Sequence, residues 1–517
     1  EILIGLVGSE MCIRDRYYGN QQFLFVYEQF DDVRLVAAPP SSIGKFGGDT
    51  DNWIWPRHTG DFSMFRVYAS KDNRPAAYSP QNVPYRPKKH FSISTKGVKE
   101  GDFTMIYGFP GNTQEYILSD AVAYIAERSD PAKIAIRTGR LDIITKAQES
   151  DPALRIHYAA KHASIANAWK KWQGEALGID RRGTVAAKFD YETQFGLWSV
   201  GRPEYAGVVM GLRAEYDRIM DAYFAYEITR ETLSTLPAAY TPEERAEECF
   251  ARRKFAEQAL WRHAFREYGR CPKVYRTPSY AEGMARYKSP EAYADALFEA
   301  VWEGSDSVAM QPAVRLREET KRMLDHISWM LGTKSLRNLN SKILNELYTT
   351  YIKGLREWDR ERAFYPDANL TLRVAYGSVA GYEYADGEYH KPQTTLDGII
   401  AKDNPEIYDY DIPQSLRDLY ASKNYGRWGT VIDGRRTVPV CFLATNHTTG
   451  GNSGSPVLNA GGELIGINFD RTWRSTMSDI AFDPAICRNI AVDIRYVLFV
   501  VDRVGGAGYL LKEMTLK

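Results

Sequence analysis

The chain has 517 residues, and its 66 basic side chains are balanced by 66 acidic ones. This length suffices for roughly two to four domains with a large buried core. The zero net charge gives no global electrostatic reason to expect binding to nucleic acid or to an anionic membrane. No apolar run approaches the roughly 20 residues that a membrane-spanning helix needs, since the best one, at 496–501, is bounded by Arg495 and Asp502.

The first 16 residues differ in character from the rest of the chain. They contain no initiator Met, and they lack the basic start and the small-residue cleavage site of a signal peptide. They are similar to translated adapter sequence that contaminates assembled sequence data. We therefore predict that residues 1–16 are a non-native segment, that the natural chain is entered at Tyr17, and that its true start, signal peptide included, lies upstream.

Residues 17–116 are expected to form β structure. Short β-rich runs are separated by proline-rich turns and occur at 23–27, 33–36, 62–68, 91–94 and 103–108. Several short strands at this spacing predict part of a β-barrel.

The composition changes near Ile117, where Ala, Glu, Arg and Leu begin to recur at helical spacing. The apolar residues of 316–330 form one stripe of an amphipathic helix. Helix starts are predicted at Asp130-Pro131 and at Thr241-Pro242, where a capping residue precedes a proline. These features predict an inserted α-helical domain at 117–368, without the repeat period of a solenoid.

Strands return in the last part of the chain, 369–517. Two are expected at 370–376 and 438–443, and a hairpin is expected from 457–458 to 464–467 around a Gly-containing turn. The stretch 490–514 is expected to close this part as a strand followed by a helix. The sequence therefore predicts β structure, a large helical insertion, and β structure again.

The loop before the hairpin surrounds one serine with glycines, in the sequence GGNSGSP at 450–456. Glycines permit a sharp turn that lifts a hydroxyl clear of the backbone and directs N–H groups at an oxyanion. Ser453 is therefore the candidate nucleophile, and the N–H groups of Gly451 and Ser453 have the spacing of an oxyanion hole. A simple Gly-rich turn is the alternative. A serine nucleophile also needs a base and a third group that holds the base.

A second dense segment, FGGDTDNWIWPRHTGDF at 46–62, combines glycines, tryptophans and polar residues. A polar and aromatic loop of this kind is costly to order unless it builds a site. Asp61 directly precedes the predicted strand at 62–68, where it could present a carboxylate to a base. An ordinary turn residue is the alternative interpretation of Asp61.

The two motifs together resemble those of the bacterial dipeptidyl-peptidase family S46, and the resemblance extends from Tyr17 to the end of the chain. It implies a chymotrypsin-like double β-barrel, with the first barrel incomplete in this sequence, interrupted by a large helical domain. It also implies an exported serine exopeptidase, periplasmic or associated with the cell surface and commonly a homodimer. Such an enzyme removes dipeptides from peptides that have a free N-terminus.

The resemblance also assigns roles to individual residues. Ser453 resembles the nucleophile and Asp61 the acid that orients the base. The remaining positions resemble those that bind the substrate around its N-terminal amine: Asn52, Trp53, Arg57, Asn167 and Asp470. For Asn167, which lies in the predicted helical domain, a solvent-facing helix residue is the alternative. An ammonium group favours carboxylate and amide oxygens. Groups of this kind at the end of the cleft would bind the N-terminal amine and limit the released product to a dipeptide.

Arg471 bears on the substrate preference. An arginine at this position resembles the type 11 enzymes of the family, which cleave after Asp or Glu, whereas the type 7 enzymes prefer apolar residues. A guanidinium binds a carboxylate through two parallel hydrogen bonds. In a strand, the neighbours Asp470 and Arg471 would face different sides and could serve different subsites. The alternatives are a surface Arg–Asp pair, an apolar preference, or a catalytically dead peptide-binding homologue; the helical insertion disfavours an endopeptidase.

The base of the triad is not evident in this chain. In a chymotrypsin-like order the histidine precedes the aspartate, and no histidine occurs before His58, which lies in the same loop as Asp61. His447 belongs to the loop of the nucleophile. The other histidines are expected at surface or packing positions: His90, His157, His162, His263, His326 and His390. The chain as given is therefore expected to be inactive, with the base supplied by a region upstream of it.

No metal site is indicated. The five cysteines form neither a Cys-x-x-Cys pair nor a zinc spacing, which leaves one disulfide or free thiols open. Metal and nucleotide cofactors have no support in the sequence.

Overall fold

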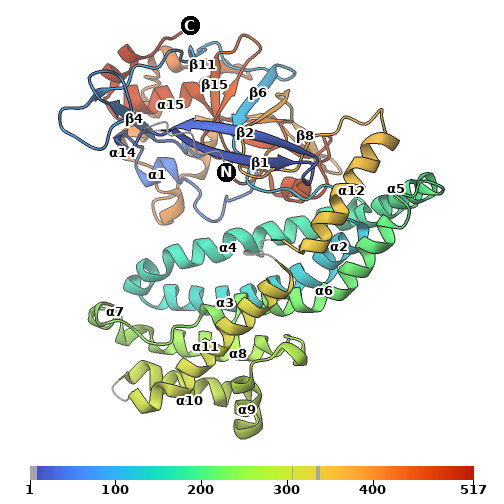
Figure 1. Ribbon diagram of the computed structural model, residues 1–517. Helices are drawn as coiled ribbons and strands as arrows, with labels where there is room; N and C mark the ends of the chain where they lie inside the picture. The colour runs from blue at the N-terminus through green and yellow to red at the C-terminus, as the bar shows by residue number, and fades with distance from the viewer. Residues whose placement is uncertain (1–8, 305–306, 333–337) are drawn as a thin grey trace. The chain divides into compact units, whose positions relative to one another are not determined.

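The computed structural model describes residues 9–304, 307–332 and 338–517, and the chain divides into two compact units (Figure 1). Unit 1 joins Glu1–Glu115 with Tyr365–Lys517, and unit 2 is the intervening segment Tyr116–Phe364. The boundaries predicted from composition lie at 116 and 368.

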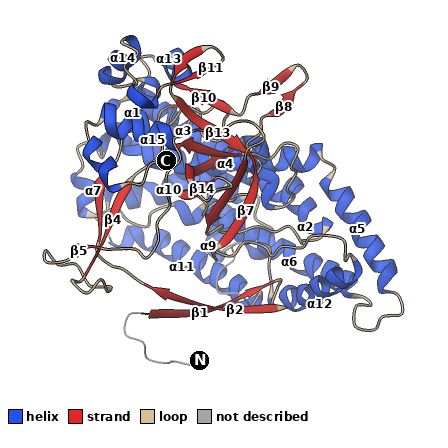
Figure 2. Cartoon of the chain, turned by 90° about the horizontal axis from the view of Figure 1, so that it is seen from above, coloured by secondary structure: helices blue, strands red, loops and turns tan. Residues whose placement is uncertain are grey.

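Unit 1 is built on a seven-stranded antiparallel sheet in the order β10-β13-β16-β15-β14-β6-β7 (Figure 2). Its strands are β6 (Phe103–Gly108), β7 (Arg373–Ser378), β10 (Gln393–Thr395), β13 (Pro439–Ala444), β14 (Ser455–Leu458), β15 (Leu464–Arg471) and β16 (Asn489–Asp493). Every residue of β13 and β16 is buried, which agrees with the apolar sequence of β13. The predicted hairpin is β14–β15, so the serine loop ends where β14 begins.

Smaller sheets complete the β structure of unit 1. They are β1–β2 (Ser9–Arg16, Gln21–Glu28), β3–β4–β5 (Val33–Ala37, Met64–Ala69, Val83–Pro84), β8–β9 (Tyr382–Ala385, Glu388–His390) and β11–β12 (Thr430–Ile432, Arg435–Thr437). The predicted run 91–94 was wrong as a strand, because only isolated bridges form at Ile93. Residues 9–16, which we set aside as non-native, pair with β2 along the whole of β1; their origin stays a prediction.

The sheets of the described residues do not form the predicted double β-barrel, whose first barrel we expect to be incomplete. One contact nevertheless links distant strands of the large sheet. Val379, directly after β7, forms an isolated bridge with Ala444 at the end of β13, and Thr445 N–H donates to the Ser378 carbonyl at 2.9 Å. The sheet therefore curls enough for two of its non-adjacent strands to meet at one corner.

Short helices and a buried cluster cover one side of the sheet. The helices of unit 1 are α1 (Ser41–Gly44), α13 (Leu396–Lys402), α14 (Gln414–Ala421) and α15 (Ile494–Phe499). Trp428, Tyr496 and Phe499 are almost fully buried in the same cluster as residues of β13 and β16. The predicted strand and helix at the end of the chain are β16 and α15. The four cysteines whose side chains the structure describes are buried free thiols, two in each unit.

Unit 2 is helical, as its composition predicts. Its helices are α2 (Ser119–Ala123), α3 (Asp130–Ser150), α4 (Pro152–Arg181), α5 (Thr184–Ser199), α6 (Val208–Glu231), α7 (Pro242–Ala246), α8 (Lys254–Tyr268), α9 (Pro278–Tyr287), α10 (Pro290–Glu303), α11 (Ser307–Met330) and α12 (Lys342–Trp358). Among the described residues, no helix combines the length and the apolar character needed to cross a membrane.

The two predicted helix starts have different outcomes. Thr241 caps α7 through a full capping box with Glu244, as predicted. The α-helix α3 begins at Asp130 with Pro131 in its first turn, as predicted, but Asp130 does not cap a free helix end, because the preceding Ser129 is itself helical and α3 continues a π-helical turn at Tyr124–Ser129. The wider π turn offers room for the ring of Pro131, so the proline does not end the helix.

Candidate active site

The serine loop is held by its own backbone and by one buried asparagine. Asn452 is buried; its side-chain oxygen accepts from Thr449 N–H at 3.1 Å, and its carbonyl accepts from Ser455 N–H at 3.1 Å. The turn needs glycine at position 451, which has φ +103° and where a Cβ would overlap the carbonyl of Phe109. The sequence motif therefore encodes a rigid turn that leaves the side chain of Ser453 exposed.

Two N–H groups beside the serine make no hydrogen bond to any described residue. They belong to Gly451 and Ser453, whereas the intervening Asn452 N–H and the following Gly454 N–H donate to Thr449 and Asn468 carbonyls. Donors spaced in this way around a nucleophile are suited to stabilise an oxyanion. This geometry matches the oxyanion hole that the sequence suggests.

Strand β15 passes directly beside the serine. The Ser453 hydroxyl donates to the Phe469 carbonyl at 3.2 Å. The β15–β16 ladder shifts by one residue here, because Asn468 pairs with Ala491 and Asp470 with Ile490, so Phe469 is the extra residue of a bulge. The two residues after the bulge are the predicted substrate-binding residues Asp470 and Arg471.

Asp470 is fixed by groups from the 46–62 loop. Its carboxylate accepts from Arg57 at 2.8 Å and from the Trp53 N–H at 3.4 Å, and both partners of the ion pair are about nine-tenths buried. Trp53 has φ +67°, an unfavourable conformation for a bulky residue. Such strain of roughly 1–3 kcal/mol persists only where the surroundings enforce it and is typical of functional sites. The structure thus joins three of the predicted residues into one contact group.

Asp61 lies within electrostatic reach of this group. Its pKa is raised above the usual value, first because the surrounding protein excludes part of its solvent, while Arg57 opposes the rise and the like charge of Asp470 adds to it. The side chain is nevertheless exposed, which limits the size of the rise. Asp61 precedes β4 by three positions, so it stands in the loop before the strand and not at its first residue.

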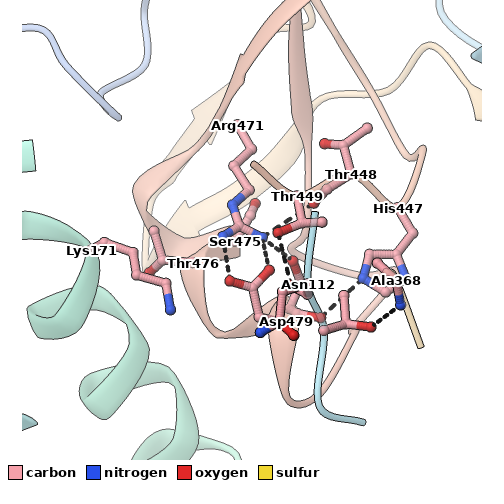
Figure 3. A network of polar contacts seen from close by, with 12 residues as sticks. Asn112, Lys171, Ala368, His447, Thr448, Thr449, Arg471, Ser475, Thr476 and Asp479 are labelled. Atoms are coloured by element: carbon pink, nitrogen blue, oxygen red, sulfur yellow. Dashed lines mark hydrogen bonds and ion pairs between the residues drawn. The ribbon is translucent and has the colours of Figure 1, made fainter. Parts of the chain in front are cut away.

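Arg471 turns away from Asp470 and is buried. Its guanidinium binds the carboxylate of Asp479 through two nitrogens, at 2.6 and 2.9 Å, and also donates to the Thr448 carbonyl at 3.1 Å (Figure 3). The Trp53 ring lies 5.6 Å from the guanidinium carbon. Neighbouring residues of β15 therefore contact different partners, as strand alternation predicts, and the alternative of an exposed surface pair does not describe this arginine.

The remaining two candidates are placed less fully. Asn52 is half-buried next to Trp53 in unit 1. Asn167 is an exposed residue of α4 in unit 2, so its role toward the substrate stays a prediction.

Comparison with known proteins identifies the family. The family description Peptidase S46 matches residues 8–253 and 239–516. The chain belongs to peptidase family S46. An Asp/Glu-specific dipeptidyl-peptidase of Capnocytophaga gingivalis is 42% identical in an alignment 554 positions long. The alignment covers 98% of this chain and 76% of that relative. Dipeptidyl-peptidase 7 of Porphyromonas gingivalis is 34% identical, again over 98% of this chain and 76% of the relative.

A solved S46 structure shares the fold. Porphyromonas endodontalis DPP11 in complex with the dipeptide Arg-Glu superposes with a TM-score of 0.84 at 34% identity, covering 99% of this chain and 78% of that one. The resemblance to Asp/Glu-specific dipeptidyl-peptidases and, more distantly, to dipeptidyl-peptidase 7 is thereby confirmed.

The histidines of this S46 chain do not contact the serine: within the described residues, no histidine nitrogen is bonded to the Ser453 hydroxyl. His58 is buried, with its ring against Gly398, and burial together with the charge of Lys402 lowers its pKa to about 3. His447 bonds to the Ser478 carbonyl at 2.9 Å and stacks on Phe482, and burial lowers its pKa to about 4. Both rings are neutral packing groups in this structure.

Each of the other histidines likewise has a neighbour of its own. Their contacts are His90 with Thr515, His157 with Arg253, His162 with Thr145, His263 with the Ile136 carbonyl, His326 with Trp329, and His390 with Glu388.

One cluster has the side chains of a metal site. His157, Glu247 and Cys249 of unit 2 place their ligand atoms within 4.8 Å of one another. The Arg253 guanidinium lies 2.7 Å from the His157 ring and 3.3 Å from the Glu247 carboxylate. A cationic side chain therefore already neutralises these groups, and the arrangement fits an ion-paired network better than a metal centre.

The sequence analysis missed two contributors to the site. Asp479, the partner of Arg471, ends a 3-10 turn at Trp473–Asp479 that carries no periodic signal. The Phe469 carbonyl is brought to Ser453 by a bulge, which changes the register without changing the residue pattern.

Proposed function

We propose that this chain carries the nucleophile and the substrate-reading residues of a serine dipeptidyl-peptidase that prefers Asp or Glu as the second residue of its substrate. Ser453 attacks the carbonyl of the second residue, and the Gly451 and Ser453 N–H groups stabilise the oxyanion. Asp470 receives the free α-amine of the peptide, framed by the 46–62 loop. Arg471 receives the acidic side chain.

One observation carries this proposal. Three consecutive residues of β15 provide three different groups. The Phe469 carbonyl accepts from Ser453, the Asp470 carboxylate is fixed by Arg57, and Arg471 supplies a buried guanidinium. A short strand segment thus offers the groups that an N-terminal dipeptide with an acidic second residue requires. The similarity to Asp/Glu-specific dipeptidyl-peptidases supports the same preference.

We further propose that the chain as given is inactive. The Ser453 hydroxyl donates to a carbonyl, and the two histidines nearest in sequence to the site residues, the buried His58 and the half-buried His447, have lowered pKa values that keep them neutral. Loss of the base of such a triad lowers turnover by about 10⁶-fold, on the order of 8 kcal/mol of barrier. In the active enzyme a histidine from additional residues would abstract the Ser453 proton, with Asp61 orienting it.

The test compares the 517-residue chain with a version extended upstream to include a histidine. Both are assayed on peptides that begin Xaa-Glu or Xaa-Leu, with N-acetylated peptides as the control for a free N-terminus. We expect turnover only by the extended version and only on the free Xaa-Glu peptide. Clear turnover by the shorter chain that disappears in Ser453→Ala would refute the proposed inactivity.

The preference itself is tested in the extended version by Arg471→Gly. Loss of one partner of a buried charge pair costs about 2–5 kcal/mol, so we expect the ratio of Xaa-Glu to Xaa-Leu turnover to fall by roughly 30-fold or more. An unchanged ratio would contradict the acidic preference and favour the apolar one. Binding of free-amine peptides by an extended version that has no turnover would instead indicate a peptide-binding homologue.

The finer architecture and the cellular context are part of this proposal. A double barrel is supported by the curl of the large sheet at Val379 and Ala444 and would be completed by further strands. Export to the periplasm or cell surface and assembly as a homodimer follow from the family resemblance. Cell fractionation and sedimentation of the natural protein test the last two statements.

A further inference from the structure

The guanidinium of Arg471 is fully engaged with a carboxylate of the protein itself. Asp479 faces it with both oxygens, at 2.6 Å from one terminal nitrogen and 2.9 Å from the other (Figure 3). An acidic side chain of a substrate would bind the Arg471 guanidinium in the same bidentate geometry. Asp479 therefore occupies the position on Arg471 that the proposed function assigns to the acidic side chain of the substrate.

Arg471 does not depend on Asp479 alone for its orientation. The nitrogen that faces one Asp479 oxygen also donates to the Ser478 hydroxyl at 2.9 Å and to the Thr448 carbonyl at 3.1 Å. The main chain of Ser478 is fixed in turn, since its carbonyl bonds to His447 at 2.9 Å. Uncharged acceptors on the protein thus hold the guanidinium in place whether or not Asp479 contacts it.

The single positive charge of Arg471 can be balanced by only one carboxylate at a time. The side chain of Arg471 is 5% exposed and that of Asp479 14% exposed. A buried cation without a counter-ion is strongly destabilised, which explains why the ligand-free protein supplies one. A second carboxylate would leave an excess negative charge in the same enclosed space, where like charges repel each other.

Asp479 can leave the guanidinium without disturbing the fold around it. Its backbone is anchored separately, because its carbonyl accepts from Gln114 N–H at 2.6 Å. Only its side chain has to rotate.

We propose that Asp479 is an internal stand-in for the acidic side chain of the substrate. It neutralises Arg471 in the ligand-free protein, and the carboxylate of a bound Asp or Glu displaces it. Asp479 is thus a specificity-determining residue that acts through Arg471: it protects the buried charge and weakens the binding of acidic ligands, while ligands without an acidic side chain leave the internal pair intact. This inference rests on the proposed function of Arg471.

Binding of dipeptides to the 517-residue chain, measured by calorimetry at neutral pH, tests the proposal. Arg-Glu and Arg-Gln serve as probes that differ in one charge. In Asp479→Asn, which removes the competing charge and keeps the size of the side chain, we expect Arg-Glu to bind about tenfold more tightly, with Arg-Gln unchanged. Asp433→Asn is the matched control, because Asp433 forms an exposed pair with Lys391 in the same unit and should change neither affinity.

The outcomes separate this inference from the proposed function. If the unsubstituted chain binds Arg-Glu no better than Arg-Gln, the role of Arg471 in acid recognition is wrong. If it discriminates and Asp479→Asn weakens Arg-Glu or leaves it unchanged, Asp479 orients Arg471 and does not compete. Should Asp479→Asn fail to fold, a crystal structure of the unsubstituted chain with Arg-Glu decides: an Asp479 carboxylate still bonded to Arg471 through both oxygens overturns the proposal.

Discussion

Acidification is expected to destabilise unit 1 through the buried His58 and the half-buried His447. His58 and His447 have pKa values lowered to about 3 and about 4, in both cases chiefly by burial. The ordinary value of a histidine in an unfolded chain is about 6.5. The unfolded state binds these protons more readily than the folded state. The contribution of the two neutral rings to the free energy of unfolding is therefore fully present above about pH 6.5 and is lost as the pH falls toward the folded-state pKa values.

The size of the effect follows from these values. At about pH 5 an unfolded histidine is almost fully protonated while both folded rings are still neutral, so each ring contributes a loss of about 2 kcal/mol relative to neutral pH. The two rings together predict a loss of about 4 kcal/mol, a large fraction of the roughly 5–15 kcal/mol that stabilises a typical protein.

The buried thiols of Cys441 and Cys487 report on unit 1 separately from unit 2. After equilibration in urea at each pH, a short pulse of thiol reagent at one fixed pH labels these cysteines only where unit 1 has opened. We expect the urea midpoint to fall between neutral pH and about pH 5, and the fall to shrink to a small fraction in the double variant His58→Gln, His447→Gln. A variant that retains the whole fall would refute the reasoning.

Two further substitutions probe the site. Asp470→Asn removes the counter-charge of the buried Arg57 and should destabilise unit 1 by about 3–5 kcal/mol, measured by the same urea assay; a loss below about 1 kcal/mol would mean that solvent already screens the pair. Gly451→Ala forces a Cβ into the Phe109 carbonyl at a positive φ and should cost more than about 1 kcal/mol while lowering turnover of the extended enzyme; normal stability and turnover would contradict the requirement for glycine at this position.

The sequence revealed the units and the main chemical groups because these depend on local patterns. Helical periodicity, the capping box at Thr241 and the apolar strands β13 and β16 each have a direct signal. The glycines around Ser453 likewise predicted a turn that the structure contains. Motif residues from the 46–62 loop and from β15 were expected together and are in contact through Arg57 and Asp470.

What the sequence could not show depends on register and on pairing at a distance. The strand expected at 91–94 has suitable residues, but only isolated bridges form there. The cap expected at Asp130 is absent, because a π-helical turn directly precedes α3 and continues into it. Asp479 lies in an irregular turn, and nothing in its neighbours indicates that it pairs with Arg471.

The bulge at Phe469 makes the length of β15 as important as its composition. Deletion of this one residue would restore regular pairing, with Asp470 still opposite Ile490 and Arg471 still opposite Asn489, but it would remove the Phe469 carbonyl that Ser453 contacts. Under the function proposed above, substitution at position 471 would change the substrate preference and leave this contact in place, whereas a change in the length of β15 would alter the surroundings of the nucleophile itself.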